Sequence, residues 1–193
     1  MNLQELVSGP MGNQLISNLS NQMGIKNENV AAAVSVALPF LLTQMNRNAQ
    51  SGAGASSLDN ALNQHAQRPV AGAVNNFNLA DGLGILGHLF GNRQNQVAQN
   101  IGKQSGISSG QVMQIMAVLA PIVMSYLGRE KQQQNVGASG LSGLLGGLLG
   151  GMSQSNQREM SAIEQMLDSN NDGNISDDIV NIGSRLLGGF FRK

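Results

Sequence analysis

The chain has 193 residues, of which 11 are Lys or Arg and 11 are Asp or Glu, so its formal net charge is zero. Charged residues make up 11% of the sequence, against about 25% in ordinary globular proteins. This balance argues against a strongly basic nucleic-acid-binding protein and against an acidic disordered tail. There is no cysteine, which excludes disulfides, thiolate zinc sites and cysteine nucleophiles.

The N-terminus shows no secretion signal, because residues 1–5 contain no basic region and Pro10 and Gly12 interrupt the first apolar stretch. The longest apolar runs, 30–42 and 115–124, are shorter than the roughly 20 residues that cross a bilayer. We therefore expect no transmembrane segment and a cytoplasmic protein. Export without a cleavable signal would leave no mark in the sequence.

An internal repeat organises the chain up to residue 130. Residues 18–48 align with residues 100–130 at a constant offset of 82, without a gap. The identical pairs are Asn18/Asn100, Gln22/Gln104, Gly24/Gly106, Ile25/Ile107, Val30/Val112, Val36/Val118, Pro39/Pro121 and Arg47/Arg129. Self-similarity at a fixed spacing is typical of repeated supersecondary units. The alignment predicts two related helical units, one after the other.

Each unit is expected to be a helix, a tight turn and a second helix. Leu15, Leu19 and Met23 recur every four residues, which is the helical period. Gly24 and Gly106 then stand where a left-handed C-cap residue is expected. The predicted N-caps of the second helices are Asn27 or Asn29 and Ser108 or Ser109.

Pro39 and Pro121 fall inside the second predicted helix of each unit. An interior proline removes a hydrogen bond and clashes with the preceding turn, so it either bends the helix or ends it. The same position in both units favours a bend. The expected core positions are Leu19, Ile25, Val30, Val34, Leu38 and Leu41 in the first unit, and Ile101, Ile107, Val112, Ile115, Val118 and Leu119 in the second.

Short segments between the units carry their own signals. Residues 51–57 have the small-residue composition of a flexible linker. A short helix over 58–65 and a loop over 68–78 are expected next. The predicted domains are a first helical unit at 1–70, a second unit with a Leu/Gly-rich helix at 71–152, and a C-terminal helix–loop–helix at 153–193.

The segment 141–152 predicts a helix with two distinct faces. Leucines recur along one face and glycines at four-residue spacing along another, which lets two helices approach closely. Since each interior glycine costs about 1 kcal/mol, this helix needs a partner in the same chain, in a second copy or at a membrane surface. The absence of flanking lysines weakens the membrane alternative. The predicted self-association residues are Leu141, Gly143, Leu144, Gly147, Leu148 and Gly151.

The sharpest motif is the segment 168–178, where oxygen-bearing side chains alternate around Gly173 as in a calcium-binding loop. The predicted Ca²⁺ ligands are the side chains of Asp168, Asn170, Asp172 and Asp178 and the carbonyl of Asn174. Position 12 of the loop, an acid in an EF-hand, is Ile179, so we expect modest affinity. The alternative is an Asx-rich turn followed by a helix that Ser176 caps.

The paired Gly–Ile turns, the Leu–Gly segment and the terminal Asp-rich loop, in that order, resemble the bacterial DUF937 family, which consists of uncharacterised proteins with kinship to YidB-like proteins. The resemblance covers nearly the whole chain. Family members often carry more aspartate in the loop, where this chain has Asn170 and Asn171. The resemblance implies an all-helical bacterial protein and adds no chemistry. The expected fold is all-α, with two helix-turn-helix units in tandem and an EF-hand-like helix–loop–helix at the C-terminus.

The sequence favours a non-enzymatic structural or interaction protein with a calcium loop and self-association. Its only histidines, His65 and His88, stand in different segments with no obvious partner, and we find no strand followed by a phosphate-binding glycine loop. The alternative is DNA binding, because the spacing from Gly24 to Val30 matches a helix-turn-helix. Lys26 is the only lysine at the two would-be recognition-helix starts, which argues against nucleic acid as the partner.

Overall fold

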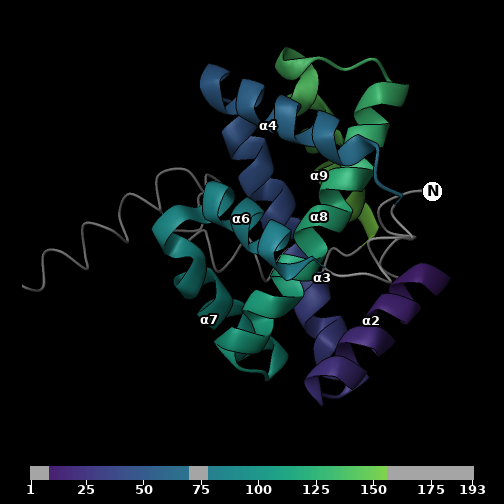
Figure 1. Ribbon diagram of the computed structural model, residues 1–193, viewed down its shortest axis with the longest axis vertical. Coiled ribbons are helices and arrows are strands. Elements are labelled where there is room, and N and C mark those ends of the chain that lie inside the picture. The colour runs from purple at the N-terminus through teal and green to yellow at the C-terminus, as the bar shows by residue number, and fades with distance from the viewer. Residues whose placement is uncertain (1–8, 70–77, 156–193) are drawn as a thin grey trace, which may run out of the picture. The chain divides into compact units, whose positions relative to one another are not determined.

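The computed structural model describes residues 9–69 and 78–155, and every regular element in these ranges is a helix (Figure 1). The α-helices are α2 (Pro10–Met23), α3 (Asn27–Ala49), α4 (Gly52–Ala66), α6 (Leu79–Phe90), α7 (Gln94–Ser105), α8 (Ser109–Gln133) and α9 (Leu141–Ser155). Two 3-10 turns, η1 (Gly91–Arg93) and η2 (Ala138–Gly140), precede α7 and α9. The predicted all-α class is confirmed over the described ranges. Contacts divide the chain into Met1–Gly150 and Gly151–Lys193, so the two aligned repeats, 18–48 and 100–130, lie within the first of these two parts.

The two glycine turns have the same local geometry. Gly24 and Gly106 adopt left-handed φ angles of 65° and 70°. Their amides donate to the carbonyls of Ser20 and Gly102, and the next amide donates to the same carbonyl at 3.2 Å in both turns. In both, the helix before the turn ends and the helix after it begins at positions 82 residues apart. These are the helix boundaries that the repeat predicts.

The residue four positions before each turn glycine lies against the returning chain and has to be small. The hydroxyl of Ser20 donates a hydrogen bond to the carbonyl of Ile25. At the equivalent position, a Cβ on Gly102 would lie only 2.6 Å from the carbonyl oxygen of Ile107. The first turn accommodates a serine because its hydroxyl bonds to that carbonyl, whereas the second turn has no room for a side chain.

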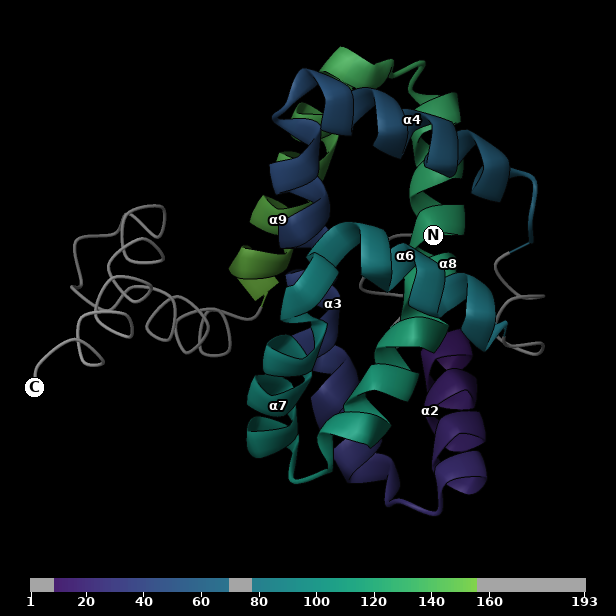
Figure 2. The same cartoon turned by 60° about the vertical axis from the view of Figure 1, so that its left-hand side comes forward.

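Helix α8 is the central element of the described part. Every residue from 115 to 128 is buried, as expected of a helix that is apolar on all sides. Helices α3, α4, α6 and α7 all contact it, and α4 and α6 cross it (Figure 2). Pro39 and Pro121 lie inside α3 and α8, which continue well beyond them. The alternative in which each proline ends its helix is therefore wrong.

Helices α3 and α8 are long and apolar enough to cross a membrane, judged by length and composition only. They are longer than the uninterrupted apolar runs from which we expected no transmembrane segment. Their most apolar windows are 56% and 78% buried within the protein. The core helices of a soluble protein pass the same test, so the expectation of no transmembrane segment stays a prediction.

Close approach of helices at glycine allows α8 to be enclosed. A Cβ on Gly82 of α6 would lie 1.7 Å from the carbonyl oxygen of Ala117 in α8. That oxygen belongs to the residue four positions before Pro121, which has no amide hydrogen to donate to it. Proline thus frees a carbonyl on α8, and glycine lets the α6 backbone reach it. On the other crossing, a Cβ on Gly128 would lie 2.4 Å from the carbonyl oxygen of Leu62 in α4.

The linker predicted over 51–57 is wrong, because α4 begins at Gly52. Ser51 caps this helix by accepting a hydrogen bond from the Gly54 amide at 3.1 Å. Ala55 and Leu58 are buried, so the small-residue stretch belongs to a helix that packs into the protein. The composition of this stretch fits a linker, but the packing of Ala55 and Leu58 into the protein favours a helix.

The cap and core predictions have mixed outcomes. Ser108 caps α8 and forms a capping box with Gln111, as one of the two predicted alternatives has it. The N-cap of α3 is Lys26, which makes no side-chain cap, so both asparagine alternatives are wrong. The predicted core residues are buried except Ile25 and Ile107, which are half-buried at equivalent places in the two turns.

The crossing of α6 and α8 gives a direct test. Gly82→Ala is expected to lower the free energy of unfolding by about 1–3 kcal/mol, because the new methyl group must push α6 away from the Ala117 carbonyl. The matched control is Gly84→Ala in the same helix, where no described atom lies within 4 Å of the added methyl group. That variant should gain up to about 1 kcal/mol. Urea unfolding followed by circular dichroism measures both, and equal effects would contradict the close crossing.

Candidate functional site

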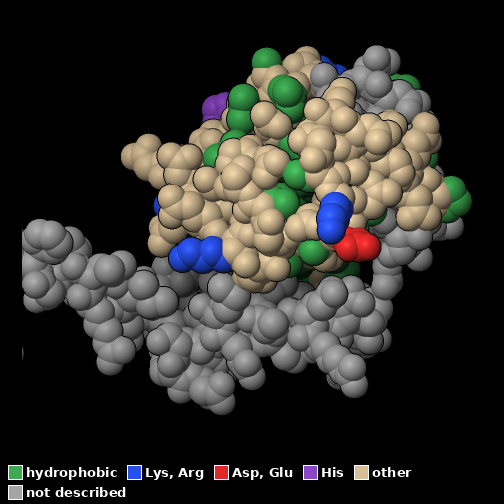
Figure 3. Space-filling model, turned by 90° about the horizontal axis from the view of Figure 1, so that it is seen from below, with side chains coloured by type: hydrophobic (Ala, Val, Ile, Leu, Met, Phe, Trp, Pro, Cys, Tyr) green, Lys and Arg blue, Asp and Glu red, His purple; other side chains and the backbone are tan. Residues whose placement is uncertain are grey.

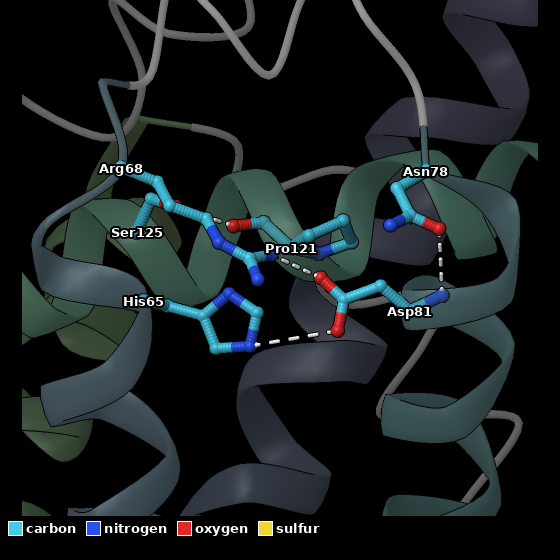
Figure 4. Close-up of polar contacts among 6 residues, drawn as sticks. All are labelled: His65, Arg68, Asn78, Asp81, Pro121 and Ser125. Atoms are coloured by element: carbon cyan, nitrogen blue, oxygen red, sulfur yellow. Dashed lines mark hydrogen bonds and ion pairs between the residues drawn. The ribbon is translucent and has the colours of Figure 1, made fainter.

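Three titratable side chains meet where α4 ends and α6 begins (Figure 4). His65 lies in the last turn of α4, Arg68 follows that helix, and Asp81 lies in the first turn of α6. The Nη1 atom of Arg68 pairs with one carboxylate oxygen of Asp81. The Nε2 atom of His65 lies 3.9 Å from the other oxygen. The cluster therefore joins the ends of two helices that both cross α8.

Asp81 is positioned by the cap of its own helix. The side-chain oxygen of Asn78 accepts a hydrogen bond from the Asp81 amide at 3.1 Å (Figure 4). A carboxylate in the first turn also interacts favourably with the positive end of the helix dipole. The carboxylate is thereby held toward His65 and Arg68.

His65 is buried, with 6% of its surface exposed. Its Nδ1 atom has no hydrogen-bond partner among the described residues, and the 3.9 Å from Nε2 to Asp81 is too long for a hydrogen bond. Burial lowers the pKa of His65; the negative charge of Asp81 opposes this effect, and the positive charge of Arg68 adds to it. Since the net shift is downward, the imidazole is neutral at pH 7.

Helix α8 anchors the other side of this junction. The guanidinium of Arg129 donates to the carbonyls of Ala66 at 3.4 Å and Arg68 at 3.1 Å. Nearby in the view of Figure 4, the Ser125 hydroxyl donates to the Pro121 carbonyl at 2.8 Å. The end of α4 is thus held by polar contacts from α8 as well as from α6.

The cluster has the composition of an acid–base pair but the surroundings of a structural junction. Within the described residues, no hydroxyl group makes a hydrogen bond to His65. The same ranges hold no group of three or more His, Cys, Asp or Glu residues that could bind a metal ion. The contacts of these three side chains join the end of α4 to the start of α6.

The sequence shows no obvious partner for either histidine, and the structure places Asp81 beside His65. The two residues stand 16 positions apart, so no local pattern links them. One signal was present in the sequence. Asn78 stands three residues before Asp81, the spacing of a helix N-cap, and this spacing marks the start of a helix that returns to α4. His88 is exposed on α6.

The predicted self-association residues all lie on α9. Leu141 is fully buried, as is its neighbour Leu145, whereas Leu144 and Leu148 are half-buried. The glycines of the set, Gly143, Gly147 and Gly151, are exposed. The leucine face therefore has its partner within the chain, while the glycine face lies outward.

The two glycine turns lie side by side. The side chain of Asn29, in the first turn of α3, donates to the Ser105 carbonyl at 3.0 Å and to the Gly106 carbonyl at 3.4 Å. Figure 3 shows the end of the described helices that carries both turns, and the Lys and Arg side chains of the described residues in this view are few and separated. A surface that neutralises many phosphates would need a denser arrangement. The geometry thus adds no support to the DNA-binding alternative.

The predicted calcium ligands Asp168, Asn170, Asp172, Asn174 and Asp178 lie outside the described residues. The structure describes nothing beyond residue 155, so the calcium loop and its EF-hand-like flanks remain sequence-based predictions.

These observations define an all-helical protein with two matching glycine turns. The model of a family described as bacterial proteins of unknown function, DUF937, matches residues 5–132. The chain belongs to this family, as the resemblance predicted. The match includes both glycine turns and nearly all of α8, and it ends before α9 and the Asp-rich loop. No curated protein and no solved structure matches the chain.

Burial of His65 predicts a specific dependence of stability on pH. The unfolded chain binds a proton at this residue with a pKa of about 6.5, whereas the folded chain binds it less tightly. The unfolded state therefore takes up more protons as the pH falls through about 6.5, and the free energy of unfolding decreases. His65→Gln should flatten this decrease between about pH 7.5 and 5.5. Urea unfolding at a series of pH values measures it, with His88→Gln as the control; parallel curves for wild type and His65→Gln would refute the assignment.

Proposed function

We propose that this chain is a non-enzymatic bacterial interaction protein in which a helical domain presents α9 to a second copy of the same chain. The outward glycine face of α9 carries the proposal. Gly143, Gly146, Gly147 and Gly150 have no described atom within 4 Å of the position that a Cβ would occupy. Gly82 and Gly128, where helices cross within the chain, have backbone atoms closer than 3 Å to that position.

The energetics of α9 support a partner for this face. Each interior glycine costs about 1 kcal/mol relative to alanine, so four such residues cost roughly 4 kcal/mol, and no described atom lies within 4 Å of the added Cβ at these positions. Glycines at this spacing let two helix backbones approach closely. Leu141 and Leu145 on the opposite face are already buried in the chain. A second helix against the glycine face would recover the cost.

A second copy is the partner that fits best. Helix α9 contains no charged residue, so two identical faces meet without electrostatic repulsion. A two-fold axis also needs a surface that complements itself, which a flat strip of small residues provides. The same lack of charge leaves little for nucleic acid to bind.

The proposal of a non-enzymatic role rests on how the protein uses its buried histidine. His65 is held in a helix junction between Asp81 and Arg68, and that structural use accounts for its burial without any reaction. We also propose a cytoplasmic location, on the sequence argument given above. The matched geometry at Gly24 and Gly106 supports the interpretation that two helix-turn-helix units stand in tandem.

Self-association through α9 predicts that one substitution changes the molecular mass of the protein in solution without lowering its stability. Gly147→Leu should shift the protein from dimer to monomer in multi-angle light scattering, because the side chain fills the space that the second helix needs. Its stability at low protein concentration should not fall, since Gly147 is exposed and a Cβ there has no described atom within 4 Å. The control is Gly84→Leu on α6, which is equally open and should leave the mass unchanged. A wild-type monomer at millimolar concentration would sink the proposal.

The Asp-rich loop is proposed as a calcium site of modest affinity, because alternating oxygen ligands surround Gly173 and the acid at position 12 is missing. Titration calorimetry should give a calcium heat with wild type and none with Asp172→Ala. Magnesium should compete poorly, since it demands a smaller and more regular octahedron. If wild type gives no heat up to millimolar calcium, the loop is a turn followed by a capped helix. Light scattering with calcium and with chelator then tells whether the ion affects assembly.

A further inference from the structure

A triad of polar side chains links α4 to α8. Among the described residues, Lys131 of α8 is the one lysine that is buried. Its Nζ atom lies 2.6 Å from the Oδ1 atom of Asp59 and donates a hydrogen bond to the Oδ1 atom of Asn63 at 2.7 Å. The Asn63 amide in turn donates to the other Asp59 oxygen at 3.2 Å. Since Asp59 and Asn63 both belong to α4, these three side chains bind one another across the contact between the two helices.

The stability of the contact does not by itself account for such a triad. Removing an ammonium and a carboxylate from water costs free energy that their attraction only partly returns, so apolar replacements of similar volume are often neutral or stabilising. Apolar contacts already hold α4, because Leu58 and Leu62 are buried. The best attested use of a buried polar contact is to select one pairing of helices over another.

The sequence contains a competitor for α4. With an offset of 83, residues 54–62 align with residues 137–145, and five of the nine positions are identical. The identical pairs are Gly54/Gly137, Ala55/Ala138, Ser56/Ser139, Leu58/Leu141 and Leu62/Leu145. All four of these leucines are buried. α9 is therefore the repeat counterpart of α4, as α3 is the counterpart of α8, and the apolar pattern alone would let either short helix pack against either long one.

The three members of the triad come together in only one of these pairings. The α9 counterparts of the two α4 residues offer neither a carboxylate nor an amide, since they are Ser142 and Gly146. On the long helices, Lys131 of α8 corresponds to Ala49 of α3. The charge and the hydrogen bonds of the triad are thus available to α4 on α8, but not to α4 on α3 or to α9 on α8.

The crossing of α4 and α8 (Figure 2) discriminates in the same direction through its shape. Gly128 lets the Leu62 carbonyl approach, because a Cβ there would lie 2.4 Å from that oxygen. The α3 residue at the equivalent repeat position is Asn46, whose side chain would occupy this space. Shape and charge therefore both favour α8 over α3 as the helix on which α4 packs.

We propose that the triad of Lys131, Asp59 and Asn63 determines the pairing of α4 with α8 and prevents exchange among the duplicated helices, within one chain or between two copies. A wrong pairing would bury the Lys131 ammonium without an acceptor, which is strongly unfavourable. Exchange of identical helices between copies is otherwise an easy route to intertwined dimers. The inference rests on the contacts of α4, and it holds whether or not the glycine face of α9 binds a second copy.

An apolar variant of the full chain separates stability from pairing. Asp59→Leu, Asn63→Leu and Lys131→Met, combined, should unfold at a urea concentration no lower than that of wild type, because a buried ion pair is replaced by side chains of similar volume. Wild type should show one set of amide resonances in nitrogen-15 NMR spectra. After refolding from urea, the apolar variant should show more than one set, or a larger mass than wild type in light scattering at the same concentration.

The matched control is Arg129→Met. Arg129 also binds α4, through the carbonyls of Ala66 and Arg68, but its counterpart on α3 is again an arginine, Arg47. This contact therefore cannot distinguish the two long helices. The control should unfold at a lower urea concentration and keep one set of resonances and the wild-type mass. The proposal is overturned if the control gives the same mixture as the apolar variant, or if the apolar variant keeps one set of resonances and the wild-type mass.

Reversal of the charges keeps the test decisive if the apolar variant does not fold. Lys131→Asp places two carboxylates side by side and should abolish the single set of resonances, because like charges repel. Adding Asp59→Lys restores a pair of opposite charges and should return the spectrum to one set. A double variant that does not regain a single set of resonances contradicts the proposal.

Discussion

The fold depends on enclosing α8. Helix α8 is buried on every side over residues 115–128, and two of its neighbours reach it by approaching to backbone contact. Gly82 on α6 and Gly128 on α8 supply the two close crossings. Pro121 has no amide hydrogen to donate to the Ala117 carbonyl four residues earlier. The α6 backbone at Gly82 lies against that carbonyl. The positions of α4 and α6 against α8 depend on these two crossings.

The polar junction at His65 is a consequence of these crossings. Because α4 and α6 both cross α8, the end of one lies near the start of the other, and their terminal polar groups must be satisfied between them. Asp81, Arg68 and Arg129 provide charges and donors for those groups. His65 is carried into the interior with them. Its neutral imidazole fills space at the junction, where it is buried beside Asp81.

Local features of this fold could be predicted from the sequence, and features made by distant contacts could not. The glycine turns carry their own signal, because Gly24 and Gly106 adopt left-handed backbone angles that other residues avoid. The start of α4 escaped prediction because the same small residues serve in linkers and in packed helices. The partner of His65 escaped it because sixteen residues separate the two side chains. The calcium loop lies outside the described residues.

The two repeat units share a sequence pattern but cannot share surroundings, because only one of their long helices can be central. α8 takes that position, so its Arg129 meets the carbonyls at the end of α4. The identical Arg47, in the last turn of α3, has no such acceptor among the described residues. The turns differ in the same way, since Ser20 has room for its hydroxyl where Gly102 has none. Equal residues thus take different roles in the two units, because the elements packed against them differ.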